Sequence, residues 1–157
     1  MKKLRILLLI PILSWGAIQV LNYFSKPTAP LGVVEGNLAK CAARPNSVCS
    51  QATDKQHFIE PLVWSTTPEE AWESLRAVVE RMRGVTMVEV TDEYMRCEFR
   101  TSLMRYIDDV EFMNSPAEHL IHARSASRIG HSDLGANRKR IERIRSALSR
   151  ELESGAK

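Results

Sequence analysis

Residues 124–145, RSASRIGHSDLGANRKRIERIR, hold the densest group of side chains that could do chemistry. The first half mixes serines, arginines, a histidine and glycines, and the second half has the pattern of a basic helix. A serine with His131 and a nearby aspartate, Asp108 or Asp133, has the residue types of a catalytic triad. Arginines beside a helix N-terminus are typical of an anion site. The same residues also fit a simple corner between a strand and a helix.

The catalytic interpretation lacks the local patterns that such chemistry uses. No nucleophile elbow surrounds any of the nearby serines. Asp108 and Asp109 point to opposite faces if they lie in a strand, and no helical H-E-x-x-H spacing accompanies the histidines. We therefore predict no catalytic residue, metal or cofactor, and keep as an alternative an enzyme that uses polar residues around Asp108 and His131.

The corner interpretation accounts for most of the stretch. Gly130 permits a sharp turn after the strand, and Asp133 or the serine before it can cap the following helix. The arginines alternate onto the polar face of the strand, opposite acidic residues of the preceding strand. On this face they should be exposed, so the predicted ligand- or partner-binding residues are Arg124, Arg128 and His131.

Several polar residues fall where apolar ones are expected. Asp108 lies between Tyr106 and Val110 on the apolar face of its strand, and a buried carboxylate is costly unless it is paired. Arg138, or the first N–H groups of the last helix, could pair with it. We predict that the structural polar contacts between this helix and the sheet come from Asp108, Asn137, Arg138 and Asp133.

The periodicity of the chain predicts the elements that position these residues. Thr67, Pro68 and Glu70 provide a cap, a first-turn proline and a capping box for a helix over 65–84. Leu134, Ile141, Ile144 and Leu148 form the apolar stripe of the last helix. Four period-two runs follow this first helix, over 85–91, 94–102, 106–113 and 119–129. A further edge strand is predicted before the helix, over 57–64. The predicted fold is α+β, a two-layer sandwich of a four- or five-stranded antiparallel sheet with two helices on one face and solvent on the other.

The first residues have the features of a membrane anchor. Cationic side chains precede an uncharged run over 6–25, long enough for a transmembrane helix. Residues 1–26 are thus predicted to cross the bacterial inner membrane once, with 27–37 as a linker and 38–157 as a periplasmic α+β domain. The alternative is a signal segment cleaved near Ser14-Trp15-Gly16, which releases the domain into the periplasm.

The cysteine spacing predicts a disulfide, and the small net charge argues against nucleic acid as a partner. Cys41 and Cys49 bracket a Pro-Asn turn, so in an oxidising compartment we expect a disulfide between them. Cys97 falls on an apolar strand face and should be buried. The net charge of +3 is small, and no basic stretch is interleaved with aromatic residues, so nucleic acid is not an expected partner.

Several stretches resemble one known family. DDVEF (108–112) and RSASRIGHSDLGANRKR (124–140) carry most of the likeness, and RPNSVCSQA (44–52) and PEEAW (68–72) add to it. They resemble the uncharacterised family called domain of unknown function 1499, over roughly residues 38–150. Its members often carry an N-terminal membrane or export segment, and they commonly have cysteine where Ser47 stands here. The family has no assigned activity, so the resemblance implies a type of domain and not a reaction.

Together these patterns predict a membrane-anchored extracytoplasmic domain of the bacterial cell envelope. We expect a non-catalytic module that binds an unknown protein or a small anionic ligand. The cell-envelope enzyme described above and a purely structural accessory domain are the alternatives.

Overall fold

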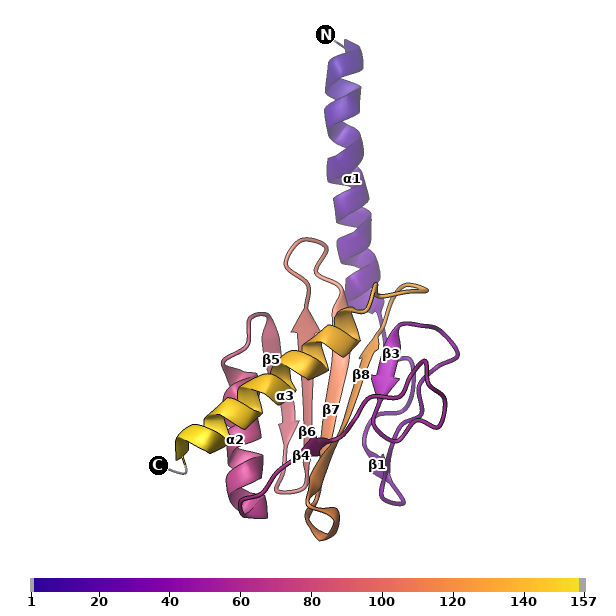
Figure 1. The fold of residues 1–157 in the computed structure, drawn as a ribbon. Helices are drawn as coiled ribbons and strands as arrows, with labels where there is room; N and C mark the ends of the chain where they lie inside the picture. The colour runs from indigo at the N-terminus through magenta and orange to yellow at the C-terminus, as the bar shows by residue number, and fades with distance from the viewer. Residues whose placement is uncertain (1, 156–157) are drawn as a thin grey trace.

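The computed structural model describes the backbone of residues 2–155 and the side chains of residues 13–155 (Figure 1). Long helices flank a sheet whose principal strands come from the second half of the chain. In chain order the elements are α1 (Lys2–Phe24), β1 (Val33–Val34), β2 (Asn37–Leu38), β3 (Ser47–Cys49), β4 (Leu62–Val63), α2 (Pro68–Glu80), β5 (Val85–Val90), β6 (Tyr94–Arg100), β7 (Ile107–Ser115), the short 3-10 helix η1 (Pro116–Glu118), β8 (Leu120–Ser127) and α3 (Ala136–Gly155).

The main sheet is antiparallel, with the strand order β3-β8-β7-β6-β5. The short strand β4 also pairs with β8, which brings the sheet to six strands among the described residues. The four long strands and the edge strand before α2 confirm the sequence prediction. The predicted count was too small because β3, three buried residues inside a loop-like stretch, shows no alternation that could reveal it.

Both α2 and α3 pack on one face of this sheet, as expected for an α+β sandwich. The cap of α2 is also as predicted, since Thr67 accepts a hydrogen bond from the Glu70 N–H at 3.2 Å. Alternate residues of the strands meet the apolar stripes of the two helices in one core. Its members include Met95, Cys97, Phe99, Val110, Phe112, Trp72, Leu75, Val79, Ile141, Ile144 and Leu148.

The opposite face of the sheet is not open to solvent, contrary to the prediction. Leu38 packs there against Tyr94 and Met113. The Gly32 N–H also donates to Glu111 in β7 at 2.8 Å. The predicted linker over 27–37 therefore includes β1 and the first residue of β2, and the hairpin of these strands lies against the sheet. This cover buries polar side chains that the alternation placed in water.

α1 leaves the domain at the end that carries the β6–β7 and β8–α3 loops (Figure 1). Its second half contacts the β6–β7 loop, where Asn22 Nδ2 donates to the Met104 carbonyl at 2.8 Å. Among the described residues no helix combines the length and the apolar character needed to cross a membrane. The predicted membrane-spanning helix is thus not confirmed, and the side chains of its cationic start lie outside the described residues.

Candidate ligand-binding site

A cleft of about 730 Å³ opens between the β1–β2 hairpin and the chain that follows β3. Its floor is formed largely by small and apolar side chains, and polar groups surround its rim. The floor includes Leu38, Ala39, Cys41, Cys49 and Ala52, and the rim includes Glu35, Asn37, Lys40, Gln51, Thr53 and Asp54. The cleft is thus built by the segment over 29–54, most of which the sequence left without regular structure.

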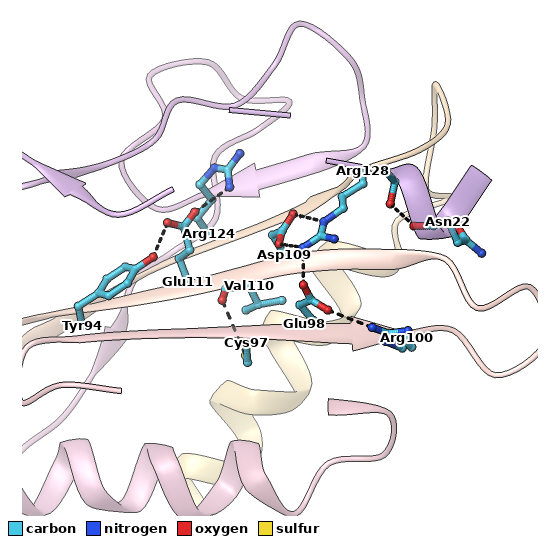
Figure 2. Close-up of polar contacts among 11 residues, drawn as sticks. Asn22, Tyr94, Cys97, Glu98, Arg100, Asp109, Val110, Glu111, Arg124 and Arg128 are labelled. Carbon is cyan, nitrogen blue, oxygen red and sulfur yellow. Dashed lines mark hydrogen bonds and ion pairs between the residues drawn. The ribbon is translucent and has the colours of Figure 1, made fainter. Parts of the chain in front are cut away.

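Behind this floor, a buried ion pair joins β7 and β8. Arg124 Nη1 donates to Glu111 Oε2 at 2.7 Å, and both side chains are fully buried. Glu111 Oε1 accepts from the Tyr94 hydroxyl and from the Gly32 N–H, both at 2.8 Å. Figure 2 shows Glu111 in β7 contacted by Arg124 from β8 on one side and by Tyr94 from β6 on the other. Burial, followed by the charge of Glu111, raises the pKa of Tyr94, so this hydroxyl remains a donor.

Charges alternate in sign across the strands at the position of Glu111. Arg124 lies opposite Glu111, which lies opposite Arg96, which in turn lies opposite Glu89. Opposite charges directly across antiparallel strands stabilise the pairing. The pairing of arginines with acidic residues on the next strand is therefore as predicted, but the exposure of Arg124 is not.

Arg124 is only partly satisfied by this pairing. Its Nε and Nη2 nitrogens have no hydrogen-bond partner within the part of the chain that the structure describes. Cys49 is its register partner in β3, so the two side chains lie on the same face of the sheet. Arg124 therefore has two N–H groups without acceptors, beside the β3 residue Cys49 that forms part of the cleft floor.

The two cysteines of the cleft are free thiols, as is Cys97. The disulfide expected between Cys41 and Cys49 is therefore not present. Burial raises the pKa of Cys41 to about 11 and also raises that of Cys49. The short loop between Cys41 and Cys49 does bring both residues to one cleft. Their spacing in the sequence was not enough to predict whether they form a disulfide.

Arg128, the second arginine of the predicted binding residues, belongs to another cluster of charged side chains on the same face of the sheet. Arg128 donates to both oxygens of Asp109, at 2.7 and 2.8 Å, and to Glu98 at 2.5 Å (Figure 2). These contacts, the hydrogen bonds to Asp109 first, raise its pKa. The exposure predicted for Arg128 is wrong, because 91% of its side-chain surface is covered. His131 is exposed as expected, in the loop before α3.

On the helix-covered face, a polar network fixes α3 to the sheet. Asp108 is buried and forms an ion pair with Arg140. Ser125 donates to Asn137 Oδ1 at 2.5 Å, and Asn137 donates to the Ser127 hydroxyl and to the Asn46 carbonyl at 3.0 and 2.9 Å. The predicted structural roles of Asp108 and Asn137 agree with these contacts.

The remaining predicted polar contacts have different partners. Asp133 accepts from the Asn137 N–H at 2.7 Å and so caps the start of α3. Arg138 donates to the carbonyls of Gln56 and Phe58 and does not pair with Asp108. Arg140, two residues after Arg138, is the actual partner of Asp108. The sequence does not show this, because the choice between the two arginines depends on how the helix axis crosses the sheet. Within the described residues no hydrogen bond joins Asp108 to His131, the pair of the enzyme alternative.

Comparison with known proteins identifies the domain type. The family model Protein of unknown function (DUF1499) matches residues 37–148, which include the sheet, α2 and most of α3. No curated protein and no solved structure matches the chain. The match extends over more than half of the chain, so this chain belongs to the DUF1499 family.

Proposed function

We propose that this chain is a membrane-anchored, extracytoplasmic binding module of the bacterial cell envelope. Its ligand is small, with an apolar body that lies on the cleft floor and an oxygen acceptor that reaches Arg124. The observation that carries this proposal is a buried guanidinium with two unpartnered nitrogens, among described residues, whose register partner Cys49 lines a cleft of about 730 Å³. A buried donor without a partner costs free energy, and a ligand oxygen recovers it.

The charges favour an anionic or carbonyl oxygen over a cation. Glu111 already neutralises Arg124, and both of its oxygens already accept hydrogen bonds, from Tyr94, Gly32 and Arg124. What Arg124 lacks is acceptors. A ligand ammonium group has only donors and gives this site nothing.

A non-catalytic role is supported by how the other polar groups are used. Asp108 is paired with Arg140, and the serine at 125 is engaged by Asn137 and Arg140. A nucleophile and its base need to lie within hydrogen-bond reach of each other. Asp108 and Ser125 are instead committed to holding α3 on the sheet.

The cleft is testable with probes of one size and different head groups. The intact chain in lipid nanodiscs is treated with iodoacetamide, and alkylation of Cys41 is followed by mass spectrometry. Hexanoate should slow this alkylation, while hexylammonium should not. Thr53→Trp, at the exposed rim, should remove the protection by filling the cleft, and Ser65→Trp, exposed elsewhere, serves as its control. Equal protection by both probes, or none, contradicts the proposed ligand class.

The anchor and topology need separate experiments. A reporter fused after Lys157 should be active outside the cytoplasm, and the chain should remain in the membrane fraction after alkaline washing. The uncharged run over 6–25 supports this expectation. A mature protein that starts near residue 17 and washes off the membrane would contradict the anchor.

A further inference from the structure

Two loops at the α1 end of the domain expose large apolar side chains. Leu103, in the β6–β7 loop, is 73% exposed, and Leu134, in the β8–α3 loop, is 87% exposed. Figure 1 shows both loops at the end from which α1 leaves. The predicted place of Leu134 on the apolar stripe of the last helix is wrong, because α3 begins only at Ala136. Leu134 also has a φ of +54°, a conformation that L residues other than Asn and Asp seldom adopt.

The β6–β7 loop lies beside α1 and not below its end. Trp15 Nε1 donates to the Leu103 carbonyl at 3.3 Å, and Gln19 and Asn22 donate to the Met104 carbonyl. Trp15 precedes the last residue of α1 by nine positions, a rise of roughly 13 Å along the helix. The tip of this loop therefore lies beside the second half of the uncharged run over 6–25, and a bilayer that surrounds that half meets the loop as well.

A basic cleft adjoins Leu134 at this end. It has a volume of about 520 Å³, and five cationic side chains but one carboxylate, Asp133, line it among the described residues. The cationic side chains are Arg83, Arg100, Lys139, Arg140 and Arg143. Three of them, Arg83, Lys139 and Arg143, form no ion pair within residues 13–155. An exposed leucine next to unpaired cations is the combination that interfacial segments use on anionic membranes.

We infer that the α1 end is a lipid-docking surface. Leu103 and Leu134 enter the boundary between head groups and acyl chains, and the basic cleft takes the phosphate head group of an anionic phospholipid. This inference rests on the membrane anchoring proposed above, and not on the ligand cleft. It assigns a role to Leu103 and Leu134, two exposed leucines that are not part of the core.

The test measures whether Leu134 reaches lipid. The full chain, with Cys41 and Cys49 replaced by serine, carries an environment-sensitive probe at Leu134→Cys or, as a control, at Val63→Cys. Val63 is 72% exposed but lies in β4, away from this end. In vesicles of mixed zwitterionic and anionic phospholipid, spin-labelled lipid should quench the Leu134 probe about twofold or more beyond the Val63 probe. Replacing Arg83, Lys139 and Arg143 together by glutamine should abolish the effect of the anionic lipid.

A second measurement leaves all cysteines and leucines in place. The unfolding midpoint of the intact chain should be higher in vesicles with anionic lipid than in purely zwitterionic ones. The triple glutamine variant should lose this difference. Equal midpoints for the intact chain, or equal quenching at Leu134 and Val63, overturn the lipid-docking inference. If the chain washes out of the vesicles at alkaline pH, the proposed anchor has failed; if it stays and Leu134 is unquenched, only this inference has failed.

Discussion

The buried pair of Arg124 and Glu111 allows a quantitative test of the sheet face beneath the ligand cleft. Glu111→Gln keeps the volume but removes the charge. The amide oxygen can still accept from Tyr94 and Gly32, so the new –NH₂ group faces the Arg124 donor. An unpaired buried cation costs about 3–5 kcal/mol, and we expect the free energy of unfolding to fall by this amount.

The double variant Glu111→Leu/Arg124→Met removes both charges and keeps most of the volume. Its destabilisation should be smaller than the sum for the single variants Glu111→Leu and Arg124→Met by about 2 kcal/mol or more, because neither charge is left alone. Unfolding by urea is followed by tryptophan emission in mild detergent, since Trp64 and Trp72 are buried in the core. Glu80→Gln, which breaks an exposed pair with Arg76, is the control and should cost under about 1 kcal/mol. Additive effects of the two single variants would refute the energetic coupling of this pair.

Further predictions concern the fold and the cleft. Gly84→Ala should destabilise by about 1–3 kcal/mol more than Gly36→Ala, since both have positive φ but only at Gly84 does a Cβ meet a backbone oxygen, at 2.6 Å; urea unfolding compares them, and equal losses would contradict the clash. Asp108→Ala leaves a mostly buried arginine unpaired and should cost about 2–4 kcal/mol by the same measurement, whereas an unchanged midpoint would disprove the structural role. Because the pKa of Cys41 is about 11, its thiolate fraction at pH 8 should be about 100-fold below that of a thiol with pKa 9.0, and its alkylation rate should show this; a rate like that of free cysteine would contradict the burial. The backbone N–H of His57 lowers the pKa of Asp54, so stability present above the usual carboxyl pKa should be lost as pH falls through the lowered value, and Asp54→Asn should flatten this acid limb of the unfolding curve.

Local signals in the sequence were enough for much of the fold. The Thr67 cap, the period-two runs and the apolar stripes each report on neighbours within a few residues, and the structure confirms α2 and the four long strands. Asp108 was also interpretable, because a carboxylate among apolar neighbours requires a partner wherever the chain finds one. The identity of that partner, Arg140, depends on how α3 crosses the sheet, which no local pattern encodes.

The candidate site could not be predicted for the same reason. Alternation shows that Arg124 lies on the face away from the helices, but it does not show whether water or protein lies beyond. Here the cover comes from residues near Gly32 and Leu38, far earlier in the chain. Short strands and irregular segments of this kind carry no periodicity, so both the cleft and the burial of Arg124 were missed.

The position of β8 at the centre of these contacts has a kinetic consequence. It pairs with β3, β4 and β7, and hydrogen bonds such as that from Asn46 to Ser127 join residues 81 positions apart. Contacts of such long range slow folding, since the loop must close before they form. The early segment cannot complete its strands until β8 has been synthesised and has joined it. The sheet thus closes only after residues as far as β8 have been made, and until then the N-terminal half remains an open substrate for chaperones and proteases.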